Sequence, residues 1–471
     1  MTLDLLRFMT AGSVDDGKST LIGRLLYDTK QVLEDQLEHV EAASERRGGE
    51  GSLDLALLTD GLRAEREQGI TIDVAYRYFA TPKRRFIIAD CPGHRQYTRN
   101  MVTGASTADV AVILLDARKG VLEQSKRHAF ISALLGIPKL VVAVNKMDLV
   151  SYSQERFEEV VTEFEGFAPN LREGGRRAGA QYEIIYMPIS ALNGDNVVER
   201  SQAMPWFDDP AHPATLLELL EQVEVAYDHP YDRPARFPVQ WVIRPGGSTA
   251  AATMTGSANG SSANDGGSAN DGGGATGAGA NGNGGATATL GDYRGYAGQL
   301  ASGALRKGDE VTVLPSGRTT RIAAIDTYEG ELEEAMAPMS LTLRLEDELD
   351  VSRGETICRP DEAPTVAREL EADVCWMAER PLRPGGRYVI KQTTRNATAV
   401  VDEITDHVDV DTLERGPAPA ELGLNDIGRV RLRTSAPLVF DPYAENRRTG
   451  SFILIDEASN ETVGAGMIAT G

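Results

Sequence analysis

The strongest chemical signal in this sequence is a glycine-rich segment that ends in a lysine and a serine. Residues 12–19 read GSVDDGKS and match the pattern G-x-x-x-x-G-K-[ST], between an apolar run at 5–10 and a helical run at 20–26. The glycines allow successive backbone N–H groups to face a phosphate chain, and the start of a helix adds partial positive charge. The pattern predicts a triphosphate site made by Gly12, Ser13, Val14, Asp15, Asp16, Gly17, Lys18, Ser19 and Thr20, with the Ser19 hydroxyl as a Mg²⁺ ligand.

A second motif, N-K-M-D at 145–148, indicates which base is bound. It follows the apolar run 140–144, and therefore lies at the carboxyl end of a strand, where open α/β sheets bind ligands. The Asp148 carboxylate can accept hydrogen bonds from the N1–H and 2-amino groups of guanine, and adenine offers neither donor. Such charge-assisted bonds contribute about 1.5–3 kcal/mol each. We therefore expect guanine contacts from Asn145, Lys146, Asp148 and, after another apolar run, Ser190, Ala191 and Leu192.

Two further segments predict the parts that act on the γ-phosphate. The segment DCPGH ends at His94 and follows an apolar run. Asp90 is expected to hold Mg²⁺ through water, Gly93 to turn its N–H toward the γ-phosphate, and His94 to project near the attacking water. Upstream, Thr71 in the segment QGITI is expected to offer its hydroxyl to Mg²⁺ and its N–H to the γ-phosphate. Its position would then depend on whether that phosphate is present, which describes a switch.

The elements that must position these residues change character along the chain. Apolar runs alternate with amphipathic stretches as far as residue 230, which predicts a doubly wound α/β domain over 1–230. Short apolar segments between Gly and Pro turns then predict two β-barrels, at 235–361 and 365–471. Residues 246–289 contain only Gly, Ala, Ser, Thr, Asn and Asp apart from Met254. We predict a disordered insert there, because such a composition has too little apolar area to offset the entropy of ordering.

Composition and charge exclude several classes of protein. The net charge of −22 argues against binding to a nucleic-acid duplex, which depends on neutralising phosphates. The sequence has no run of 18 apolar residues, so no membrane-spanning helix is expected. The three cysteines cannot form a disulfide framework, and the N-terminus lacks the features of a signal peptide. The simplest expectation is a cytoplasmic protein with no membrane and no nucleic-acid partner.

The order of the motifs resembles that of the translational GTPase superfamily, which includes elongation factor Tu. The wording of longer stretches is similar to the large, GTPase subunit family of bacterial-type sulfate adenylyltransferases. The stretches that carry this resemblance are GSVDDGKSTLIGRLLYDTK, LLTDGLRAEREQGITIDVAYRYF, SALNGDNVVERS, DYRGYAGQLASGALRKGDEV and DPYAENRRTGSFILID. Elongation factors usually read HVDHGK where this chain reads SVDDGK, which favours the sulfate-activating family.

The resemblance implies an α/β P-loop GTPase domain followed by two all-β barrel domains. It implies the cofactors GTP and Mg²⁺, and a small partner subunit that transfers the adenylyl group of ATP to sulfate, driven by GTP hydrolysis in this chain. It also implies that Val14 and Ile70 form an apolar gate beside the catalytic His94. Some family members carry a fused adenylylsulfate kinase. This chain has no second P-loop pattern and ends at Gly471, so no kinase activity is expected.

Two other functions are compatible with the same motifs. A translation elongation factor that delivers aminoacyl-tRNA would have the same fold and the same GTP motifs, since a fold does not determine a function. A GTP-gated assembly factor without a catalytic partner is the third interpretation. Binding to aminoacyl-tRNA would support the elongation factor. Sulfate-dependent GTP hydrolysis in the presence of a partner would exclude the assembly factor.

Overall fold

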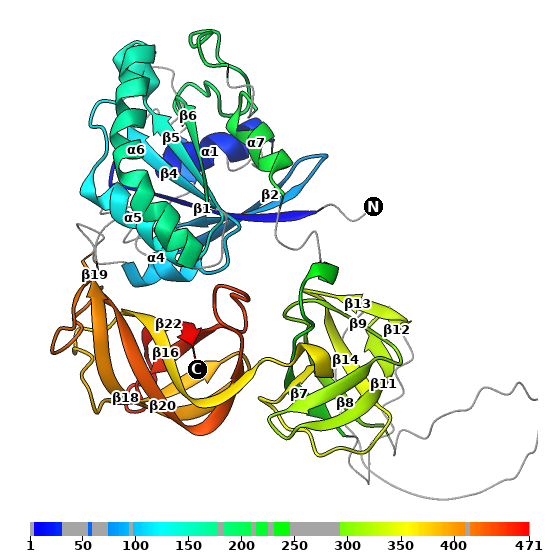
Figure 1. The fold of residues 1–471 in the computed structure, drawn as a ribbon. Coiled ribbons are helices and arrows are strands. Elements are labelled where there is room, and N and C mark those ends of the chain that lie inside the picture. The colour runs from blue at the N-terminus through cyan, green and yellow to red at the C-terminus, as the bar shows by residue number, and fades with distance from the viewer. Residues whose placement is uncertain are drawn as a thin grey trace, which may run out of the picture.

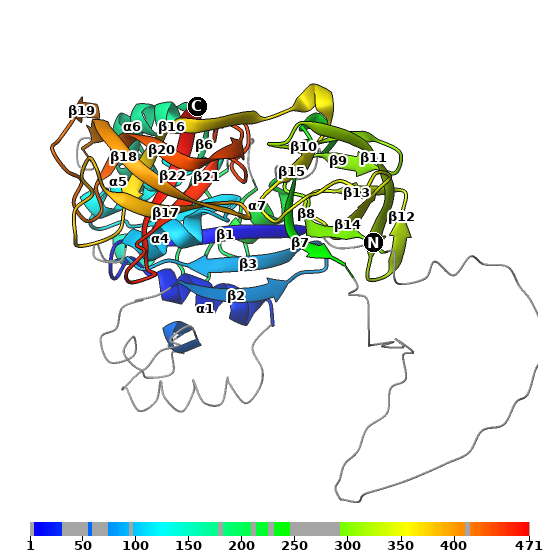
Figure 2. The same cartoon turned by 90° about the horizontal axis from the view of Figure 1, so that it is seen from below.

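The computed structural model describes residues 4–30, 55–58, 74–93, 98–177, 182–208, 213–224, 230–244, 293–409 and 415–470. An α/β unit lies against the second of two β-rich units (Figure 1), and the two β-rich units lie side by side (Figure 1, Figure 2). This architecture confirms the predicted fold class, an α/β P-loop domain followed by two all-β barrels. The insert predicted at 246–289 lies outside the described residues. Within the described part of the chain, no helix is long and apolar enough to cross a membrane.

The α/β unit contains a six-stranded sheet in the order β2-β3-β1-β4-β5-β6. Its strands are β1 (Leu5–Gly12), β2 (Ala75–Ala80), β3 (Arg85–Asp90), β4 (Val110–Asp116), β5 (Lys139–Asn145) and β6 (Glu183–Pro188). Only the β2–β3 pairing is antiparallel. The helices are α1 (Lys18–Asp28), α4 (Thr98–Ala105), α5 (Glu123–Leu134), α6 (Gln154–Arg177) and α7 (Leu216–Gln222), with short 3₁₀ turns η1 (Leu55–Leu58) and η3 (Met147–Val150).

Burial explains why the central strands read as continuous apolar runs. Every residue of β4 is buried, as is every residue of β5 after its first lysine. Strands covered on both faces need apolar side chains at every position rather than at alternate ones. Because β1, β3, β4, β5 and β6 run in the same direction, the segments that follow them gather at one edge of the sheet.

The two β-rich units each close on themselves. In the first, β10 pairs with β11 as well as with β15, and in the second, β17 pairs with β18 as well as with β21. The first unit comprises η4 (Pro230–Asp232), β7 (Phe237–Ile243), β8 (Gly295–Gln299), β9 (Ala304–Arg306), β10 (Glu310–Leu314), β11 (Arg318–Thr327), β12 (Gly330–Leu332), β13 (Glu334–Met336), β14 (Ser340–Leu345), β15 (Thr356–Cys358) and η6 (Pro360–Glu362). The second comprises β16 (Thr365–Trp376), β17 (Arg387–Gln392), β18 (Arg395–Val408), β19 (Arg415–Pro417), β20 (Ile427–Phe440), β21 (Ser451–Ile455) and β22 (Thr462–Thr470).

The segment that follows β20 connects all three units. The Tyr443 hydroxyl donates to the carbonyl of Leu135, just after α5, at 2.7 Å. The barrels are joined by a buried ion pair, in which Arg236 Nη2 lies 2.8 Å from Asp441 Oδ1. Thr449 also donates to this carboxylate, at 2.5 Å. The same segment therefore ties the second barrel both to the first barrel and to the α/β unit.

Removing one partner of the buried pair should destabilise the barrels strongly. We predict that Arg236→Ala lowers the free energy of unfolding by about 3–5 kcal/mol, because it removes one partner of a buried ion pair. The Arg383–Glu421 pair provides a matched control, since its side chains are 67% and 42% exposed. Arg383→Ala should change the free energy of unfolding by less than about 1 kcal/mol. Urea denaturation of both variants makes the comparison, and equal losses would contradict the interpretation.

Candidate functional site

The loop between β1 and α1 is shaped by two glycines that no other residue could replace. Gly12 has φ 152° and Gly17 has φ 96°, both outside the region that other residues favour. A Cβ on Gly17 would lie 2.5 Å from Asn145 Nδ2, and one on Gly12 would lie 2.7 Å from the Leu114 carbonyl oxygen. The loop therefore fits tightly between the ends of β4 and β5.

The ammonium group of Lys18 lies across this loop. Its Nζ donates to the carbonyl oxygens of Gly12, at 3.1 Å, and Ser13, at 2.9 Å. Burial lowers the pKa of Lys18, and the nearby carboxylates of Asp90 and Asp16 oppose that effect. An ammonium group has three hydrogens. Two are directed to these carbonyls, which leaves the third for a phosphate oxygen.

The segment after β3 packs directly against this loop. Asp90 is buried at the end of β3, where Thr10 Oγ1 lies 3.4 Å from its Oδ1. A Cβ on Gly93 would lie 2.6 Å from Lys18 Nζ and 2.7 Å from the carbonyl oxygen of Gly12. Only glycine fits at that position, so the backbone of residues 90–93 approaches the lysine closely. Three other residues predicted for this region lie outside the described residues. They are Ile70, the predicted gate partner of Val14, the predicted switch residue Thr71 and the predicted catalytic residue His94.

The residues that could hold a metal ion offer oxygen donors. Ser19, in the first turn of α1, supplies a hydroxyl, and Asp90 supplies a carboxylate. Mg²⁺ prefers oxygen ligands and usually combines one or two protein groups with phosphates and water. Among the described residues, no group of three His, Cys, Asp or Glu side chains could hold a metal by itself. The donor set thus fits an ion shared with a nucleotide.

A single side chain ties the phosphate loop to the segment predicted to contact the base. Asn145 is buried at the end of β5, and its Nδ2 donates to the carbonyl oxygen of Asp16 at 2.8 Å. Its Oδ1 accepts from the backbone N–H of Ala191 at 2.9 Å. The Ser190 hydroxyl donates to Asp148 Oδ1 at 2.6 Å. The structure therefore brings Asn145, Asp148, Ser190 and Ala191 together, while Leu192 is half exposed beside them.

Asp116, at the end of β4, belongs to the same corner although the sequence analysis did not select it. Its carboxylate accepts from Lys146 Nζ at 3.0 Å and from Arg118 Nη2 at 2.7 Å. Burial raises the pKa of Asp116, but the hydrogen bonds from Arg118 and Lys146 outweigh it and hold the pKa well below its ordinary value. Lys146 also donates to the Asp15 carbonyl. The signal available in the sequence was an acidic residue at the carboxyl end of a parallel strand.

His128, on α5, is a second residue that the sequence analysis missed. Its Nδ1 accepts from the backbone N–H of Gly12 at 3.1 Å, and its Nε2 lies 2.9 Å from Gln124 Nε2. Burial lowers the pKa of His128 to about 3, and the charges of Lys18 and Arg127 add to the effect. The imidazole is therefore a neutral acceptor that fixes the first residue of the phosphate loop. The spacing of Gln124 and His128, one helical turn apart, was the available signal.

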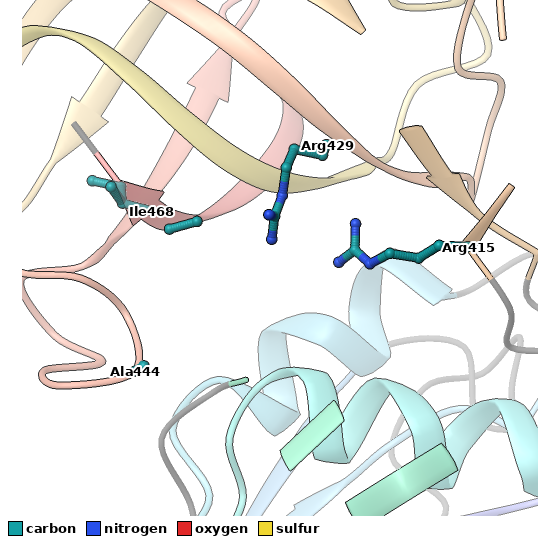
Figure 3. A pocket seen from close by; sticks show the side chains of 5 residues that line it. Arg415, Arg429, Ala444 and Ile468 are labelled. Carbon is teal, nitrogen blue, oxygen red and sulfur yellow. The ribbon is translucent and has the colours of Figure 1, made fainter. Parts of the chain in front are cut away.

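A different group of cations lies in the second barrel. A cavity of about 370 Å³ is lined by Arg415, Arg429, Ala444, Ile468 and Ala469. The guanidinium groups of Arg415 and Arg429 point toward one another (Figure 3). Both bind the carboxylate of Asp373, at 2.9 Å, and Arg415 also binds Asp406. Two arginines and two aspartates balance in charge, so we assign this cluster a structural role rather than an anion site.

The chain is similar to several known proteins. Residues 3–226 match the family model described as Elongation factor Tu GTP binding domain, and residues 369–469 match GTP-eEF1A C-terminal domain-like. The chain is 51% identical to Bifunctional enzyme CysN/CysC of Mycobacterium tuberculosis, over 98% of this chain and 67% of that protein. It is 48% identical to Sulfate adenylyltransferase subunit 1 of Bacteroides fragilis and 49% identical to that of Vibrio vulnificus, in each case over 99% of this chain and 86% of the relative. A solved structure of sup35 complexed with GDP aligns with 99% of this chain and 94% of its own, with a TM-score of 0.41 and 22% identity.

The neutral state of His128 predicts how stability depends on pH. Because burial holds its folded-state pKa at about 3, below the ordinary 6.5, only the unfolded chain takes up the proton between these values. The contribution of His128 is therefore complete above pH 6.5 and falls as the pH decreases, by up to about 1.4 kcal/mol per pH unit.

The variant His128→Asn isolates this contribution, since Asn keeps an acceptor for the Gly12 N–H but does not titrate. Urea unfolding of both proteins between pH 7.5 and 5 should show stability falling more steeply for the wild type. Parallel curves would mean that His128 is not a buried neutral base.

Proposed function

The chain belongs to the sulfate adenylyltransferase subunit 1 family, and on that premise we propose that it hydrolyses GTP, in the cytoplasm, to drive adenylyl transfer from ATP to sulfate. A small partner subunit would carry out the transfer, which forms adenylyl sulfate and pyrophosphate. The relatives from Bacteroides fragilis and Vibrio vulnificus are named subunit 1, which supports a multi-subunit enzyme. Their identity over 99% of this chain favours sulfate activation over aminoacyl-tRNA delivery.

The observation that carries the proposal is the bridge formed by Asn145. It connects the loop that would hold the phosphates, through Asp16, to the loop that would hold the base, through Ala191. A nucleotide that contacts both loops must match the distance between them. Asp148 lies beside Asn145, and its Oδ1 accepts a hydrogen bond from the Ser190 hydroxyl. We therefore assign its other carboxylate oxygen to the guanine donors.

Hydrolysis requires charge neutralisation and a positioned water. Lys18 would contact the β- and γ-phosphates, and Gly93 would offer its backbone N–H to the γ-phosphate. Ser19, Thr71 and Asp90 would hold Mg²⁺, which would supply positive charge to neutralise the phosphates. His94 would orient the attacking water, with Val14 and Ile70 as the apolar gate beside it.

Replacing Asp148 should change which base is bound. In Asp148→Asn the side-chain oxygen can keep the Ser190 bond, and the NH₂ group then faces the 2-amino group of guanine without an acceptor. We predict that GTP affinity falls at least roughly tenfold, about 1.4 kcal/mol. Xanthosine triphosphate, with a carbonyl oxygen at that position, should gain affinity and should drive adenylyl sulfate formation in the reconstituted enzyme.

The matched control is Asp195→Asn. This carboxylate lies in the same region but is bonded to Tyr152, at 2.8 Å, and Ser201, at 2.6 Å. Its substitution should leave the ratio of the two nucleotide affinities unchanged. If Asp148→Asn also leaves that ratio unchanged, the guanine assignment is wrong.

His94→Ala separates binding from hydrolysis. We predict a GTP dissociation constant within a few-fold of the wild type and a hydrolysis rate lower by roughly 10²–10⁴, the range expected for a group that orients or deprotonates water. Sulfate activation by the complex should become independent of GTP. His407→Ala, in β18 of the second barrel, is the control and should hydrolyse GTP normally. Normal turnover in His94→Ala would show that another residue positions the water.

A further inference from the structure

Arg24, in the middle of α1, contacts the segment 190–192, where we expect guanine contacts. Its Nε donates to the carbonyl oxygen of Ala191 at 3.2 Å. Its Nη2 donates to the carbonyl oxygen of Leu192. We call residues 190–193 the base loop. Arg24 thus binds two successive carbonyls of the base loop, although it lies on the helix that begins at the phosphate loop.

Neighbouring side chains hold the guanidinium group in this orientation. Asp28, one turn further along α1, accepts from Arg24 Nη1 at 3.3 Å, and the two side chains are only 17% and 22% exposed. The ring of Tyr27 lies 5.9 Å from the guanidinium carbon. A planar guanidinium with fixed donors loses little further freedom on binding two carbonyls. Arg24 is therefore held in place for this contact by its own helix.

Binding these carbonyls also fixes the N–H groups of the loop. In a trans peptide the C=O and N–H groups point in opposite directions. Holding the carbonyl of Ala191 toward α1 therefore directs the N–H of Leu192 away from α1. Holding the carbonyl of Leu192 likewise orients the N–H of Asn193, which donates to Ser190 Oγ at 3.2 Å. The N–H of Ala191 is itself held by Asn145.

We propose that Arg24 is a positioning residue for base selection, which orients the Ala191–Leu192 backbone so that an N–H group meets the guanine O6 oxygen. This inference rests on the proposed guanine site. Lys18 and Arg24 are six residues apart on one helix, which corresponds to about 9 Å along its axis. The helix α1 then acts as a rigid spacer that sets the position of the base loop relative to the phosphate loop.

The test compares two nucleotides that differ only at O6. In 6-thio-GTP a sulfur, a weak acceptor, replaces this oxygen, while the groups that face Asp148 remain. Dissociation constants of GTP and 6-thio-GTP are measured for the wild type, Arg24→Met and Arg24→Lys. Methionine keeps an apolar stem without donors, and lysine keeps the charge but cannot bind two carbonyls as a fork.

The wild type should prefer GTP to 6-thio-GTP. Arg24→Met should bind GTP roughly tenfold more weakly and 6-thio-GTP less than threefold more weakly, as expected when a hydrogen bond to O6 is lost. Arg24→Lys should change in the same direction. Thermal unfolding without nucleotide shows whether a variant is merely less stable. Lower stability alone would reduce the affinity for both nucleotides equally.

Two results would overturn the proposal, and they differ in meaning. In the first, the wild type prefers GTP to ATP, but the Arg24 variants lose affinity for GTP and 6-thio-GTP equally, or for neither. Arg24 then has no role in base selection, and the guanine site stands. If the wild type itself shows no preference for GTP over ATP, the guanine site is wrong and this inference fails with it.

Discussion

The nucleotide-binding end of this protein depends on one buried side chain, the amide of Asn145. Its two ends bind the Asp16 carbonyl and the Ala191 N–H, so two loops that are 175 residues apart in sequence share one rigid connection. Gly17 must lack a side chain because this amide occupies the space that a Cβ would need. Without the amide, Ala191 N–H would be left buried and unpaired, which costs about 1–3 kcal/mol. The geometry of the whole site therefore follows from this contact.

The sheet explains why such a contact can form, and α5 extends it toward the barrels. Parallel strands bring the ends of β1, β3, β4, β5 and β6 to one edge, where Asp90, Asp116 and Asn145 are the last residues of their strands. The helix α5 contacts the same edge through His128 and Gly12. Just beyond its other end, Leu135 accepts a hydrogen bond from Tyr443 of the second barrel. One helix thus contacts both the phosphate loop and the unit that is joined to the first barrel by Arg236 and Asp441.

Local patterns in the sequence were sufficient for some features and not for others. The fold class is confirmed, because continuous apolar strands, amphipathic helices and short β segments are local signals. Among the described residues, the phosphate loop, Asn145 with Asp148, and Ser190 with Ala191 lie together, because each of these segments follows a parallel strand of the sheet. Arg24, Asp116 and His128 were missed, because their roles arise from contacts with residues about 30 to 170 positions away. The domain limits, and the roles of His94, Ile70 and Thr71 outside the described residues, remain predictions.

In the proposed reaction, GTP hydrolysis in this chain drives an unfavourable adenylyl transfer and does not only accelerate it. The most direct measurement is the final concentration of adenylyl sulfate in a reconstituted complex of this chain with its small partner subunit, ATP and sulfate, with GTP or with GDP. If hydrolysis drives the transfer, the final concentration is higher with GTP, and adenylyl sulfate increases in proportion to the GTP consumed. If both reactions reach the same final concentration, even at different rates, GTP is only an activator and its hydrolysis does not drive the transfer.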